Sequence, residues 1–141
     1  MTVLTDEARN FNWLLETFVD ETAGVTDAMA VSSDGMLIAR SETMEAQESD
    51  LLCAIIAGTA GLAMAASRAL SGGGLERVII TMERGFLFVS AIADGSCLGV
   101  VATRDCDVGS IGYQTTDLVH RAGQLLTPAL REELTQRAAN N

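Results

Sequence analysis

The residues with the richest chemistry in this chain are its three cysteines, Cys53, Cys97 and Cys106. Their number is odd and no Cys-x-x-Cys pair occurs, so the pattern indicates neither a disulfide framework nor a zinc site. A reactive thiolate would need a nearby cation or a helix N-terminus. Arg104 lies close to Cys106, but two acids flank that cysteine directly. We therefore expect reduced thiols, as in cytosolic proteins.

The only histidine, His120, follows Asp117 by three residues and could form a general-base pair with it on a helix. The sequence places no nucleophile beside this pair, so we expect a surface or partly buried histidine. All nine bases are arginines and the chain has no lysine. The absence of lysine excludes a Walker A lysine, a Schiff-base lysine and a Ser-Lys dyad. We expect that the protein is not an enzyme and has no catalytic residue.

Two further segments have the composition of ligand sites. The run Ser71-Gly72-Gly73-Gly74 follows a predicted helix and precedes a predicted strand, the reverse of a phosphate loop, so it predicts a helix stop. The four acids between Glu42 and Asp50 lack the spacing of a calcium loop. They are typical of a solvated helix start, and a surface that meets a basic partner would also suit them. We expect no metal and no cofactor.

The charge of the chain limits its partners. Its 141 residues carry 19 acids and 9 bases, a net charge of −10, which repels nucleic acid and anionic membranes. The mean hydropathy is nevertheless +0.26, so apolar surface remains for a protein partner. Because no basic segment followed by an apolar run opens the sequence, we expect no signal peptide and a cytoplasmic location. Residues 51–67 carry no charge, but they are too rich in alanine and glycine for a typical membrane span.

The order of predicted elements is α-β-β-α-β-β-β-α, followed by a short terminal helix. It indicates an α+β fold, an α/β/α sandwich with one five-stranded antiparallel sheet. Thr5 caps the first helix and Gly24 ends it, while Thr127 and Pro128 begin the last one. The predicted spans are helices at 49–70 and 111–125, strands at 27–32, 36–40, 75–82, 86–92 and 97–103, and a loop at 104–110.

The helix at 49–70 is the most informative element. On a helical wheel, Leu51, Ile55, Leu62, Ala66 and Ala69 share one face, extended by Leu52, Ile56, Ala63 and Leu70, and we expect this face to cover the sheet. The opposite arc is small and nearly uncharged. Its two glycines cost stability unless another helix packs closely there, so we predict an intermolecular interface. This arc holds Ala54, Ala57, Gly58, Gly61, Met64, Ala65 and Arg68.

Taken together, these segments resemble the roadblock/dynein light-chain family. The resemblance lies in the order and spacing of residues 28–39, 75–80, 85–89, 94–101 and 107–109. Residues 125–130 resemble the ending of bacterial roadblock proteins from conserved operons that also encode a sensor kinase and a small Ras-like GTPase. The matching domain spans residues 5–127, and residues 128–141 form a short helix and tail.

The resemblance implies a dimeric regulator without enzyme activity. Family members form dimers in which the central helices pack side by side and the third strand pairs with its mate, and the paired helices bind a small GTPase. On this chain the resemblance assigns the pairing edge to Val78, Ile79, Ile80, Thr81 and Met82. It implies a homodimer that binds a Ras-like GTPase and modulates its GTP hydrolysis, within a sensor-kinase complex. A pure scaffold and a small-ligand sensor are alternatives.

Overall fold

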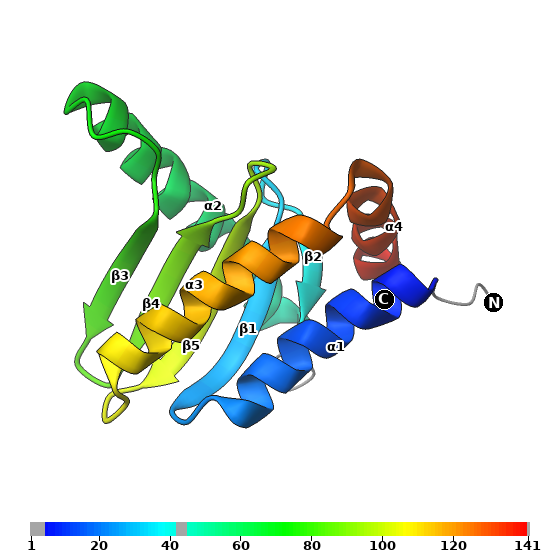
Figure 1. The fold of residues 1–141 in the computed structure, drawn as a ribbon, viewed down its shortest axis with the longest axis horizontal. Coiled ribbons are helices and arrows are strands. Elements are labelled where there is room, and N and C mark those ends of the chain that lie inside the picture. The colour runs from blue at the N-terminus through cyan, green and yellow to red at the C-terminus, as the bar shows by residue number, and fades with distance from the viewer. Residues whose placement is uncertain (1–4, 42–44, 141) are drawn as a thin grey trace.

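The computed structural model describes residues 5–41 and 45–140, and the predicted order of elements is confirmed. The five strands form one antiparallel sheet in the order β2-β1-β5-β4-β3. Figure 1 shows α1 and α3 across one face, α4 beside β2, and α2 behind the sheet. The elements are α1 (Asp6–Glu21), β1 (Val25–Val31), β2 (Leu37–Arg40), α2 (Ala46–Ala69), β3 (Arg77–Met82), β4 (Gly85–Ala91), β5 (Cys97–Thr103), α3 (Val108–Leu125) and α4 (Pro128–Ala139).

Side chains cap three of the helices. Thr5, Asp107 and Thr127 each accept a hydrogen bond from the backbone N–H three residues later, at 3.1–3.2 Å. Such a bond satisfies one of the free amides in the first turn of a helix. The caps at Thr5 and Thr127 confirm the predictions. Asp107 lies in a segment predicted as a loop, and because its carboxylate caps α3, that helix begins at Val108 rather than at Ile111.

Two other helix ends differ from the prediction. α2 begins at Ala46, three residues earlier than expected. Ser49, the expected start, is buried within the first turn, where its hydroxyl donates to the carbonyl of Ala46 at 2.9 Å. Of the acids predicted to lead into this helix, Glu42 lies outside the described residues. α1 ends at Glu21, and Gly24 takes a positive φ of 89° in the turn to β1 instead of capping the helix.

The sheet separates two apolar cores. The larger one lies under α1, α3 and α4, and it includes Phe86, Phe88 and Ile92. The smaller one lies under α2, and its buried residues are Met29, Val31, Cys53, Ile56, Ala60, Leu87, Val89 and Cys97.

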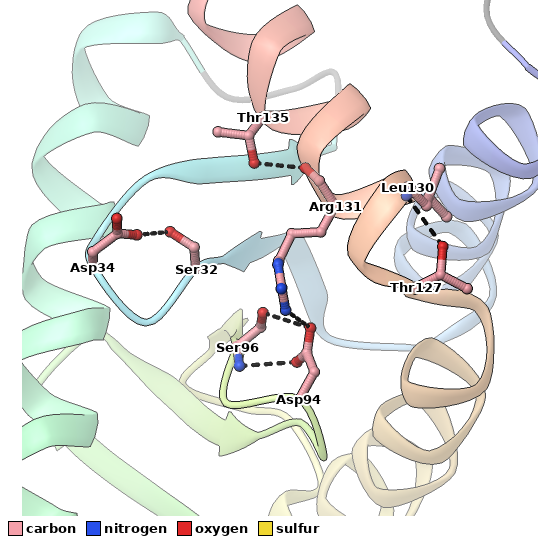
Figure 2. Close-up of polar contacts among 8 residues, drawn as sticks. All are labelled: Ser32, Asp34, Asp94, Ser96, Thr127, Leu130, Arg131 and Thr135. Carbon is pink, nitrogen blue, oxygen red and sulfur yellow. Dashed lines mark hydrogen bonds and ion pairs between the residues drawn. The ribbon is translucent and has the colours of Figure 1, made fainter.

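α4 is fixed to the larger core and lies beside β2. Leu130 and Leu134 are buried there. Arg131 Nη1 lies 2.6 Å from Asp94 Oδ2 in the turn between β4 and β5, and Asp94 also accepts the backbone N–H of Ser96 (Figure 2). One edge of the sheet, at β2, therefore has a helix anchored beside it.

Candidate partner interface

α2 is held against the sheet by a narrow stripe of buried side chains. Cys53, Ile56 and Ala60 are buried in it. Ile56 lies over Gly99 of β5, where a Cβ atom would collide with the Ile56 Cδ1. Glycine at this position lets the helix approach the sheet closely, and the rest of the helix surface stays uncovered.

The prediction that Leu51, Ile55, Leu62, Ala66 and Ala69 face the sheet is wrong. All five are exposed, and Leu62 keeps 77% of its surface open. The prediction assigned the largest side chains to the buried face. In the structure, Ile56 lies over the glycine of β5 between Cys53 and Ala60, so the helix is turned and Leu51 and Leu62 point away from the sheet. Of the residues predicted to extend the buried face, Ile56 is buried and Leu52 packs against the smaller core, whereas Leu70 is exposed.

Five of the seven positions predicted for the outer arc of α2 are exposed. Ala57 and Met64 instead pack against the smaller core, which corrects their placement. The exposed positions are Ala54, Gly58, Gly61, Ala65 and Arg68. A Cβ atom on Gly58 or Gly61 would meet nothing within 4 Å. Contacts within the described chain therefore do not explain these glycines, although each costs about 1 kcal/mol relative to alanine inside a helix.

The uncovered surface of α2 is larger than the sequence indicated. It includes Leu51, Ile55, Leu62 and Leu70 as well as the small residues, and the last of these leucines is 81% exposed. Figure 1 shows the C-terminal half of α2 standing out beyond the sheet. A continuous exposed apolar surface of this kind is typical of a protein–protein contact.

β3 is an edge strand that pairs with β4 on one side only. The amide of Ala91 donates to the carbonyl of Glu76. By the alternation of an antiparallel ladder, residues 76, 78, 80 and 82 bond β4, whereas Arg77, Ile79 and Thr81 turn their N–H and C=O groups outward. This outer edge could add a strand from a partner.

The side chains of β3 divide between the two faces of the sheet. Val78 and Ile80 are half-buried against the core under α2. Ile79, on the α3 side, and Met82, at the end of the strand, are 42% and 45% exposed, and Thr81 is exposed. The structure thus brings the predicted edge residues and the outer face of α2 to one region of the molecule, where α2 contacts β3.

The cysteines are not activated. Burial, followed by Asp50, raises the pKa of Cys53 to about 11, and burial also raises the pKa of Cys97. The pKa of Cys106 is raised as well, by burial and then by its flanking acids. A thiolate is therefore disfavoured at all three, and all three are free cysteines.

The candidate general-base pair does not assemble. Asp117 forms its ion pair with Arg121 at 3.1 Å, and the Nε2 atom of His120 lies 3.3 Å from Gln124 Nε2 on the exposed side of α3. Within residues 5–41 and 45–140, no group of three or more His, Cys, Asp or Glu side chains could hold a metal ion.

The comparison with protein families decides the identity of the fold. The model of the Roadblock/LC7 domain matches residues 11–102, well over half of the chain. The chain belongs to the Roadblock/LC7 family. This family is generally non-catalytic.

Solved structures agree with this assignment. A Roadblock/LC7 domain from Streptomyces avermitilis is 28% identical, with a TM-score of 0.74 over 78% of this chain and 92% of that one. Myxococcus xanthus MglB shares the fold at 10% identity, with a TM-score of 0.76 over 90% of this chain and 98% of that one. Acanthamoeba castellanii profilin II, 20% identical, matches with a TM-score of 0.50 over 78% and 97%. No curated protein matches the sequence.

The central helix of this roadblock domain is also long and apolar enough to cross a membrane, the one helix in the described part of the chain that is. A single such helix is weak evidence for a membrane protein, because helices packed on a sheet pass the same test. Only 22% of its apolar window is buried, which shows how much of α2 its own chain leaves uncovered.

Two hollows elsewhere on the roadblock domain bear on the ligand-sensor alternative. One of about 600 Å³ runs along β2 between α4 and the start of α2, and a shallower one of about 370 Å³ lies between α4 and the turn at Asp34 (Figure 2). Neither lies at the α2–β3 surface.

Proposed function

We propose that this protein is a non-enzymatic homodimer that binds a small Ras-like GTPase and modulates its GTP hydrolysis, as part of a cytoplasmic signalling complex of the bacterial conserved-operon type. Membership of the Roadblock/LC7 family supports this proposal. The observation that carries it is the long, nearly uncharged face of α2, which the described part of the chain leaves uncovered.

In the proposed dimer, β3 pairs with β3 of the partner and the two α2 helices lie beside each other. The outward N–H and C=O groups of Arg77, Ile79 and Thr81 would bond their counterparts and extend the sheet. Gly58 and Gly61 would allow the two helix backbones to approach closely. Pairing at this edge would also remove an exposed strand that otherwise invites aggregation.

The proposed action on the GTPase is positioning. Phosphoryl transfer in small GTPases depends on ordered switch residues and on stabilisation of charge, which a partner can supply by holding the GTPase in one conformation. The two α2 helices of the dimer form the surface that does so. Arg68 on α2 and Arg84 in the β3–β4 turn are exposed cations at this side of the molecule, but the proposal does not require either as an arginine finger.

The dimer is tested by Gly61→Glu, which places a charge on the open face of α2. We expect light scattering to show a dimer for the wild type and a monomer for this variant, with the same circular dichroism spectrum. Gly109→Glu is the matched control, because Gly109 is exposed in the first turn of α3 and its Cβ would make only an ordinary contact at 3.5 Å. A wild type that is monomeric at all concentrations would contradict the proposal.

The regulatory step is tested with the GTPase recovered by affinity capture from the native lysate on the wild-type protein. We expect capture to fail with Gly61→Glu and to persist with Gly109→Glu. Single-turnover GTP hydrolysis by the recovered GTPase should then change rate when the wild type is added. Tight binding with an unchanged rate would replace the regulator with a scaffold.

A further inference from the structure

A half-buried arginine connects the edge strand to α3. Arg77 stands at the start of β3, and its Nη2 donates to the carbonyl of Gly112 at 3.1 Å and to the hydroxyl of Thr116 at 2.6 Å. The helix has room for the guanidinium because residue 112 is a glycine: a Cβ there would lie 2.7 Å from Arg77 Nη1. A single side chain thus ties β3 to the second and third turns of α3.

This connection is a costly one. Arg77 Nε, Ser90 Oγ and Thr115 Oγ1 are buried without a hydrogen-bond partner. Ser90 lies directly opposite Arg77 on β4. Thr115 precedes Thr116, whose hydroxyl Arg77 binds. Each buried unsatisfied polar atom costs about 1–3 kcal/mol. An apolar residue at position 77 would avoid part of this cost, so stability alone gives no reason for an arginine here.

The backbone of the same residue faces the other way. Arg77 is one of the three residues of β3 whose N–H and C=O groups point to the open edge. Its side chain is therefore held by α3 while its main chain lies where a partner strand would bond. The same residue therefore contacts α3 through its side chain and the open edge through its main chain.

We infer that Arg77 is a positioning residue that couples α3 to the pairing edge, so that the placement of α3 sets the affinity of one subunit for the other. This inference rests on the proposed dimer. It assigns α3, which lies on the far face of the sheet from α2, a regulatory part in dimerisation.

Two neighbouring threonines offer a matched test. Thr116→Val removes the hydroxyl bound by Arg77, and Thr115→Val makes the same change one residue earlier at a hydroxyl without a partner. Because hydrogen bonds to charged groups are strong, we expect the dimer dissociation constant, measured by sedimentation, to rise about tenfold for Thr116→Val and to stay unchanged for Thr115→Val. Arg77→Met should raise the dissociation constant by the same factor. The double variant with Thr116→Val should raise it no further.

Amide exchange separates this inference from the proposed dimer. At concentrations where the protein is monomeric, the amides of Val78 and Ile80, which face β4, should exchange several-fold faster in Thr116→Val than in Thr115→Val. The amides of β1 should exchange at the same rate in the two variants. If the wild type never dimerises, the proposed function fails, yet this difference still tests the coupling. Equal exchange and equal dissociation constants in the two valine variants would overturn it.

Discussion

The two faces of the sheet differ in how completely they are closed. On the face of α1 and α3, Phe11, Leu15 and Phe88 are fully buried, and the outer sides of both helices carry charged residues. On the other face, α2 spans 24 residues and buries four of them. The difference indicates that the first face supplies most of the folding free energy, and in the proposed dimer the second is the face that a partner covers.

The two edges of the sheet repeat this division. β2 has four residues and lies beside α4, which an ion pair and two buried leucines hold in place. β3 has six residues, and three of them present free backbone groups to the outside. Covering one edge and leaving the other open limits strand pairing to a single site, which favours a closed dimer over an open chain of subunits.

The sharpest way to test the comparison is to make one substitution on each face. Leu15→Ala removes a fully buried side chain of α1, and Leu62→Ala removes an exposed one of α2. We expect Leu15→Ala to lower the free energy of unfolding by about 2–5 kcal/mol, as buried leucines do. Leu62→Ala should change it by less than about 0.5 kcal/mol when the protein is monomeric. Urea denaturation at low protein concentration measures both.

The same pair can break the comparison. If Leu62→Ala destabilised the monomer as much as Leu15→Ala, α2 would be a core helix and its exposed face would have no special role. At higher protein concentration the wild type should gain stability by association, and Leu62→Ala should gain less.

How far the sequence predicts this structure depends on the range of the interactions. Thr5, Thr127 and the Asp-Gly pairs at 34–35 and 94–95, whose glycines have a positive φ, act on their immediate neighbours, so the order of the elements could be predicted correctly. The rotation of α2 could not, because a helix that is apolar on nearly every side has no polar face to orient it. Its contact face is selected by Gly99, which lies on another element. The hydrogen bonds of Arg77 could not be predicted for the same reason, since their acceptors lie on another element, α3.

Gly99→Ala tests the close seating of α2 directly. The added methyl group would collide with Ile56, so either this side chain must turn or α2 must shift away from β5. We expect a loss of about 1–3 kcal/mol in the free energy of unfolding, typical of overpacking, measured by urea denaturation of the monomer. The double variant Gly99→Ala with Ile56→Val should recover part of the loss. A neutral Gly99→Ala would show that α2 sits loosely on the sheet.

The smallest expected effect is a pH dependence that distinguishes the buried side of α2 from the protein surface. Burial raises the pKa of Cys53 from 9.0 to about 11, so the folded state keeps this thiol protonated after the unfolded chain has ionised it. Its contribution to stability is present below pH 9 and is lost as the pH rises towards 11, with a size on the order of 1 kcal/mol.

Cys53→Ala should therefore flatten the fall of the urea midpoint across this range, whatever its effect on stability at neutral pH. Cys106→Ala is the control, because that cysteine lies near the surface and should alter the slope less. Equal slopes in the two variants would mean that water reaches Cys53 beneath α2. The conclusion that α2 packs closely on the sheet at this position would then be wrong.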